Sequence, residues 1–78
     1  MIENKIIQIL KTIIKKKINY KNSKKIVSDG YLDSFSILIL ISKLERSFNI
    51  KIKLENFDIN QFNSVSLIKK IISKSEKK

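Results

Sequence analysis

The sequence predicts an all-α protein, and three observations support this fold class. The chain has 78 residues with no proline and a single glycine, so it offers few of the residues that form tight turns between strands. Apolar residues, mostly isoleucine and leucine, recur at intervals of three and four positions, which is typical of one face of a helix. Hydrophobic residues make up 42% of the chain, which suffices for one small core. We therefore expect one domain over residues 1–75 and a charged tail at 76–78.

The first helix is predicted at residues 3–17. Its apolar face is formed by isoleucines three or four positions apart, namely Ile2, Ile6, Ile9 and Ile13. Glu3 lies at its N-terminal end and the lysines of residues 15–17 lie at its C-terminal end, the order that the helix dipole favours. Residues 18–33 show no helical period, so we expect a long loop that packs through its own apolar residues and uses Gly30 for an unusual backbone angle.

A second helix is predicted from Ser34 to about Asn49. Its buried face is expected to consist of Ile37, Leu40, Ile41, Leu44 and Phe48. Asp33 and Ser34 are both residue types that favour the N-cap of a helix. Phe35 and Ile39 fall on the opposite side of this helix, which predicts two large apolar side chains on the surface near Ser34.

Residues 50–62 begin with alternating apolar and polar side chains, but a lone strand would have no partner in a helical chain. We therefore predict a loop that turns three apolar residues inward, namely Ile50, Ile52 and Leu54. A one-turn helix is expected around residues 60–63, with Phe57 and Phe62 as core residues.

The last helix is predicted from Val65 to about Ser73, with Ser64 as its N-cap. Its buried face is expected to consist of Val65, Ile68, Ile71 and Ile72. The charged residues that follow are predicted to be frayed.

The composition excludes several classes of function. Without cysteine or histidine the chain has no disulfide, no cysteine nucleophile and no serine–histidine pair, and it lacks the usual zinc ligands, so we do not expect an enzyme. The longest apolar run, Ile37 to Ile41, is far shorter than the ~20 residues that span a bilayer, so we expect no membrane insertion. The N-terminus lacks the basic-then-apolar order of a signal peptide, and we expect a cytoplasmic protein.

The net charge of +10 is concentrated at the two ends of the chain. Residues 1–25 carry eight lysines against Glu3, a charge of +7, and residues 69–78 carry five lysines against Glu76, a charge of +4. Residues 26–68 have a charge of −1. The segment around Ser34 is therefore close to neutral.

Residues 29–35, Asp-Gly-Tyr-Leu-Asp-Ser-Phe, resemble the phosphopantetheine-attachment motif of acyl carrier proteins. The core of that motif is Asp-Ser followed by a large apolar residue, with a glycine upstream. The apolar positions from Leu38 to Phe48 and the segment Asn60 to Val65 also resemble the second helix and the short third helix of this family, so the resemblance covers nearly the whole chain. It implies a four-helix bundle of the acyl-carrier type, with a long first loop and a short third helix.

Carried over to this sequence, the resemblance implies that Ser34 is the attachment point of a covalent 4′-phosphopantetheine. Asp33 would help a phosphopantetheinyl transferase to place its metal ion and its coenzyme A. The thiol of the arm would carry an acyl or aminoacyl group as a thioester, between a loading enzyme and an acceptor transferase. The Leu-Asp-Ser-Phe form is most similar to D-alanine carrier proteins and other stand-alone carriers of dedicated pathways. We also expect a monomer. The inner face at Ile41, Leu44 and Phe48 is where the acyl pocket of the family opens, although a role in the core explains the same residues.

The predicted second helix differs from that of acidic carriers, because it has only Glu45 against Lys43 and Arg46. Ile39 stands where such carriers usually have a carboxylate. We therefore expect partner enzymes to dock on apolar residues beside Ser34, namely Phe35, Leu38 and Ile39.

Two alternatives to a carrier stay open. The first is a small basic helical module that binds nucleic acid or an anionic surface, because phosphate contacts require only lysines. No segment dense in Arg, Asn and Gln is present, so we expect no nucleic-acid partner. The second is a protein adaptor that would differ from a carrier only in leaving Ser34 unmodified.

Overall fold

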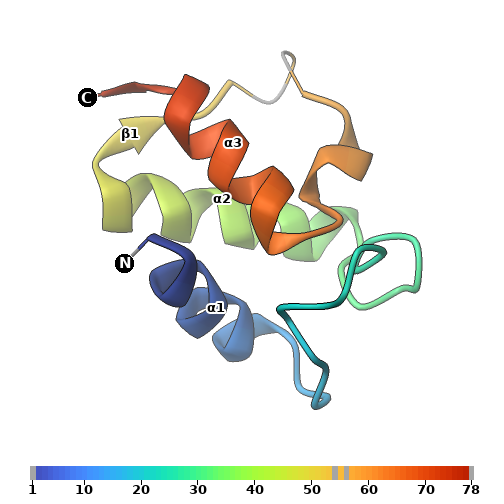
Figure 1. The fold of residues 1–78 in the computed structure, drawn as a ribbon. Coiled ribbons are helices and arrows are strands. Elements are labelled where there is room, and N and C mark those ends of the chain that lie inside the picture. Colours follow the sequence, from blue (N-terminus) through green and yellow to red (C-terminus); the bar gives the residue numbers. More distant parts are fainter. Residues whose placement is uncertain (1, 54, 56, 78) are drawn as a thin grey trace.

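A computed structural model describes residues 2–53, 55 and 57–77, and these residues form three α-helices, the short 3₁₀ helix η2 and a two-stranded sheet (Figure 1). The elements in chain order are α1 (Ile2–Ile13), α2 (Ser34–Phe48), β1 (Ile50–Lys51), η2 (Ile59–Phe62), α3 (Val65–Lys74) and β2 (Glu76–Lys77). The helix α1 packs against both α2 and α3. The long segment between α1 and α2 crosses from one end of the helical layer to the start of α2 (Figure 1).

The predicted four-helix bundle is wrong, because the described residues contain only three α-helices together with a small sheet. The short third helix of the prediction is η2, a 3₁₀ helix of four residues. The side chain of Asp58 accepts a hydrogen bond from Asn60 N at 2.9 Å, and Gln61 Oε1 accepts one from Asp58 N at 2.7 Å. These bonds close the turn at its start, and the N-cap of α3 at Ser64 follows directly after Asn63, so the chain has no room for an α-helical turn here.

The sheet is the second departure from the prediction of a loop and a frayed end. Strand β1 pairs antiparallel with β2, with Ile50 opposite Lys77 and Lys51 opposite Glu76. The side chain of Ile50 is buried, as predicted. Its backbone N–H and C=O groups lie in the plane of the strand and pair with the chain that follows α3. The charged tail therefore provides the partner strand of β1. Leu54 lies outside the described residues.

The helix α1 is four residues shorter at its C-terminal end than predicted. Ile14 N still donates a hydrogen bond to Leu10 O at 2.8 Å, but the lysines of residues 15–17 lie beyond the helix and are exposed. Ile13 and Ile14 are β-branched and have a low helix propensity, which disfavours a further turn.

The predicted buried faces of α2 and α3 are confirmed. The buried residues of these helices are Ile37, Leu40, Ile41, Leu44, Val65, Ile68, Ile71 and Ile72, while Phe48 is half-buried. Phe62 of η2 is fully buried and Phe57 packs partly against the same core. In the part of the chain that the structure describes, no helix has the length and apolar character needed to cross a membrane.

The long loop between α1 and α2 packs through its own apolar residues, as predicted. Tyr20, Ile26 and Leu32 are buried in the common core, and burial raises the pKa of the Tyr20 hydroxyl. Gly30 has a φ of +86°, a backbone angle that residues with a Cβ rarely adopt. The loop is therefore an ordered segment that ends in a fixed turn before α2.

Candidate functional site

The start of α2 is capped by Asp33, so Ser34 is the first residue of the helix. Asp33 has an extended backbone, with φ −99° and ψ −178°, and its Oδ1 accepts a hydrogen bond from Ser36 N at 2.8 Å. Because Asp33 is the N-cap, the alternative in which Ser34 caps the helix is wrong. The Ser34 side chain is exposed, and none of the hydrogen bonds found among the described residues involves its hydroxyl. That hydroxyl is therefore free to react.

Asp33, the residue directly before Ser34, has a carboxyl group whose ionised form is favoured by its surroundings. Hydrogen bonds from the backbone and side chain of Ser36 lower the pKa of Asp33 below its usual value. The Asp33 side chain is exposed. Within the described ranges, no group of three or more acidic, His or Cys side chains could hold a metal ion.

A tight turn before Asp33 fixes the backbone of the motif. Gly30 N donates to Val27 O at 3.0 Å, and Tyr31 N donates to Ile26 O at 3.0 Å. Leu32, 1% exposed, then anchors the chain in the core immediately before the exposed Asp33. The turn and this anchor together place the Asp33–Ser34 pair at the surface.

Asn63 ties the same loop to the junction between η2 and α3. Its Oδ1 accepts hydrogen bonds from Val27 N at 2.8 Å and from Ser28 N at 3.0 Å, and its backbone carbonyl accepts one from Ile26 N at 2.9 Å. The side chain is buried, and Nδ2 donates to Ser28 Oγ at 3.3 Å. The sequence prediction missed this residue, and the only signal for it was a polar pair, Asn63 and Ser64, between two core positions.

Two of the three predicted docking residues lie on the open surface of α2. Phe35 is 72% exposed and Leu38 is 54% exposed. The prediction for Ile39 was less accurate, because its side chain is partly buried. Phe35 and Leu38 are three positions apart and therefore neighbours on the helix surface, where they form an apolar pair beside Ser34.

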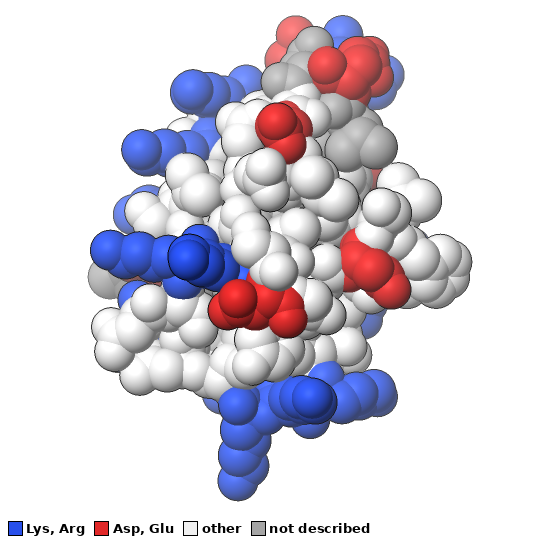
Figure 2. Space-filling view, turned by 90° about the vertical axis from the view of Figure 1, so that its right-hand side faces the viewer, with Lys and Arg blue, Asp and Glu red and all other residues white. Residues whose placement is uncertain are grey.

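Charged side chains are unevenly distributed on one face of the molecule, the face that lies on the right-hand side in Figure 1. Figure 2 shows this face, with Lys and Arg side chains gathered toward its left and lower edges. Uncharged surface and several acidic side chains occupy the area between them (Figure 2). The basic character of the ends of the chain therefore does not extend evenly over this face.

The inner stripe that the resemblance associates with an acyl pocket is part of the core. Ile41 is 7% and Leu44 0% exposed, and Phe48 is half-buried. None of these three residues lines the cavity of about 550 Å³ that opens elsewhere, between α1, the long loop and α3. The structure thus explains the stripe by packing alone.

No family model and no curated protein matches this chain. Any function assigned to the start of α2 therefore depends on the residues themselves and on their geometry.

Proposed function

We propose that this chain is an acyl carrier protein that holds an acyl or aminoacyl group as a thioester, on a 4′-phosphopantetheine arm attached to Ser34. One observation carries the proposal: the exposed hydroxyl of Ser34 stands at the first position of α2, directly after the ionised N-cap Asp33. Both residues belong to the segment that resembles the attachment motif of the family. The arm would supply the thiol that a chain without cysteine lacks.

In the attachment reaction the hydroxyl of Ser34 would be the nucleophile. The oxygen of the Ser34 hydroxyl attacks the phosphorus of coenzyme A that bears the pantetheine, and a new P–O bond forms. The bond to the leaving phosphate breaks, 3′,5′-ADP departs, and the proton of the hydroxyl passes to a base of the transferase. Asp33 would help to hold the metal ion of the transferase, which would polarise the phosphate of coenzyme A as a Lewis acid.

The apolar pair Phe35 and Leu38 would be the main contact for the transferase, for the loading enzyme and for the acceptor transferase, with the partly buried Ile39 at its edge. Side chains of this size are costly to expose together and favour protein partners. In this proposal the chain is a monomeric, non-catalytic, cytoplasmic carrier of a dedicated pathway.

Intact mass spectrometry tests the attachment directly. The protein is incubated with coenzyme A, Mg²⁺ and a phosphopantetheinyl transferase of broad specificity, and the expected result is a gain of one phosphopantetheinyl group. Ser34→Ala should abolish the gain. Ser42→Ala is the matched control, because Ser42 is an exposed serine on the same helix, and it should be modified like the wild type. A wild-type protein that stays unmodified, or an Ser34→Ala protein that gains the same mass, would contradict the proposal.

A second candidate function, the binding of nucleic acid or an anionic surface, is favoured by one observation. A shallow groove between α1 and α2 is lined by the basic residues Lys5, Lys43 and Arg46 and by no acidic residue. Charge reversal at Arg46 should weaken retention on DNA or on anionic vesicles if this candidate is correct. Retention that falls steeply with salt, in a protein that coenzyme A and transferase leave unmodified, would favour this candidate over the carrier.

A further inference from the structure

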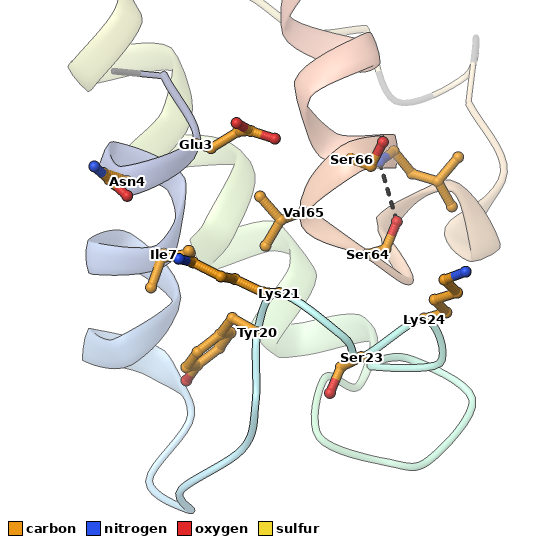
Figure 3. Close-up of a pocket in the computed structure, with 11 residues that line it drawn as sticks. Glu3, Asn4, Ile7, Tyr20, Lys21, Ser23, Lys24, Ser64, Val65 and Ser66 are labelled. Atoms are coloured by element: carbon orange, nitrogen blue, oxygen red, sulfur yellow. Dashed lines mark hydrogen bonds between the residues drawn. The ribbon is translucent and has the colours of Figure 1, made fainter.

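A cavity of about 550 Å³ opens between the first turn of α1, the loop around residues 20–24 and the first turn of α3 (Figure 3). This volume lies within the range of about 300–1,000 Å³ that is typical of sites for small molecules. The cavity is not lined by Ser34 or by any residue of α2, so the proposed attachment site does not account for it.

The α3 side of the cavity is suited to a negatively charged group. Ser64, 9% exposed, lines the cavity, and its hydroxyl oxygen accepts a hydrogen bond from Leu67 N at 3.1 Å. No acceptor for the hydroxyl hydrogen of Ser64 is found among the described residues, so this hydrogen is available to a ligand. The N–H groups of Val65 and Ser66 belong to the first turn of α3 and have no partner within the helix. Lys24 also lines this side, and its side chain extends along it in Figure 3.

The remaining walls are mainly apolar. Ile7 of α1 and Val65 of α3 face each other across the cavity, and the ring of Tyr20 lies below them (Figure 3). Two further charged groups line it: Lys21, which extends toward Ile7, and Glu3, at the first turn of α1 (Figure 3). Glu3 opposes an anion, but the two lysines outnumber it.

We propose that this cavity binds a small organic anion, with its carboxylate or phosphate at the start of α3 and a short apolar body between α1 and α3. The charged group would receive hydrogen bonds from the Ser64 hydroxyl and from the N–H of Ser66, and it would pair with Lys24. The apolar body would lie against Ile7 and Val65. This binding is independent of the arm on Ser34.

Three probes with the same alkyl chain separate the contributions to binding. Octanoate, octyl phosphate and 1-octanol are titrated into ¹⁵N-labelled protein, and backbone amide shifts are followed by NMR. Saturable shifts at Ser66, Leu67 and Lys24 are expected with at least one of the two anions, and whichever anion binds more tightly identifies the headgroup. The alcohol has the same chain without the charge and should bind about tenfold more weakly.

Charge variants then locate the anion. Lys24→Glu should weaken binding of the better anion by about tenfold or more. Lys25→Glu is the matched control, because Lys25 is an exposed neighbour outside the cavity and changes the net charge by the same amount. Glu3→Gln removes the opposing charge and should tighten binding by about threefold.

Several outcomes would overturn the proposal. Equal weakening by Lys24→Glu and Lys25→Glu would mean that the anion is attracted only by the net charge of the protein. Shifts confined to Phe35 and Leu38 would show that the alkyl chain binds to the apolar pair of α2 and not in the cavity. If 1-octanol binds as tightly as both anions, the negative charge contributes nothing to binding. A titration in which neither anion produces saturable shifts would equally rule out the site.

Discussion

The two halves of α2 present different surfaces, although they belong to one helix of 15 residues. Both halves contribute to the core, with Ile37 and Leu40 buried in the first and Leu44 in the second, but the first half also carries Leu38, which is 54% exposed. The first half begins at Ser34, directly after the N-cap Asp33, and no basic residue occurs between Asp33 and Ser42. The second half carries Lys43 and Arg46, and α1 adds Lys5 beside it.

Side-chain hydrogen bonds hold these cations at the second half. Lys43 Nζ donates to Thr12 Oγ1 at 2.8 Å, and Lys5 Nζ donates to Ser47 O at 3.3 Å. Lys5 Nζ also lies 5.2 Å from the centroid of the Phe48 ring. Positive charge is therefore fixed near the C-terminal end of α2, where the helix dipole favours it.

The distance between these charges and Ser34 determines whether they influence an enzyme that binds at Ser34. With a rise of about 1.5 Å per residue, Lys43 and Arg46 lie roughly 13 to 18 Å along the helix from Ser34. Electrostatic interactions between exposed charges are screened over about 8 Å at physiological ionic strength. An enzyme that docks at Ser34 would therefore sense the apolar pair Phe35 and Leu38 more strongly than the lysines, unless its own surface covers both halves.

The largest effect expected from this comparison concerns stability. Leu44→Ala should lower the free energy of unfolding by about 2 to 5 kcal/mol, because it opens a cavity in the core. Leu38→Ala truncates the same residue type at an exposed position of the first half and should change the free energy of unfolding by less than about 0.5 kcal/mol. Urea unfolding followed by circular dichroism measures both values. Equal losses in the two variants would show that Leu38 and Leu44 do not differ in burial.

The second prediction concerns recognition by the transferase and the loading enzyme. Leu38→Glu places a charge within the apolar pair and should reduce the kcat/KM of loading by about tenfold, with an unchanged fold. Lys43→Glu, on the other half, should have little effect, and loading of the wild type should depend only weakly on salt. Loading rates over a series of NaCl concentrations measure both. A loading rate that falls steeply with salt, or a larger effect of Lys43→Glu than of Leu38→Glu, would show that the enzymes recognise the basic second half of α2.

The third prediction is a pH dependence of stability that arises from Asp33, the N-cap before the first half of α2. The pKa of Asp33 is lower in the folded protein than its usual value of 3.8, so the ionised carboxylate stabilises the fold above that pH. This contribution should disappear as the pH falls through the lowered pKa. The difference in unfolding free energy between the wild type and Asp33→Ala should therefore be constant near neutral pH and shrink below about pH 4. A difference that persists unchanged at pH 2 would mean that ionisation of Asp33 contributes nothing.

The smallest effect is expected at Ser34 itself. Because Asp33 provides the cap, Ser34→Ala should change the free energy of unfolding by less than about 0.5 kcal/mol. Chemical denaturation of the unmodified protein measures this value. A loss of about 1 kcal/mol, as at an N-cap, would mean that the serine rather than Asp33 caps α2 in solution.

The sequence predicted the parts of the fold that depend on local pattern. The buried faces of α2 and α3 follow from apolar spacing, and the cap at Ser64 and the turn at Gly30 follow from residue type. The exposed position of Ser34 after Asp33 was predictable for the same reason. All of these features are set by residues within a few positions of one another.

The features that the sequence did not predict join distant segments. Strand β1 pairs with residues 76–77, and Asn63 bonds to Val27 and Ser28, some 35 positions earlier in the chain. The cavity of Figure 3 likewise combines three separate segments. The resemblance to a four-helix family also could not show that the capped turn at Asp58 would remain a 3₁₀ helix.

The bonds to Asn63 also have a consequence for the dynamics of the loop. The amides of Ile26, Val27 and Ser28 all donate to this one residue, two of them to the same side-chain oxygen. None of the three amides belongs to an α-helix or a strand, yet opening this single junction would release them together. They should therefore exchange with deuterium at one common rate, as a cooperative unit that links the segment before Ser34 to the start of α3.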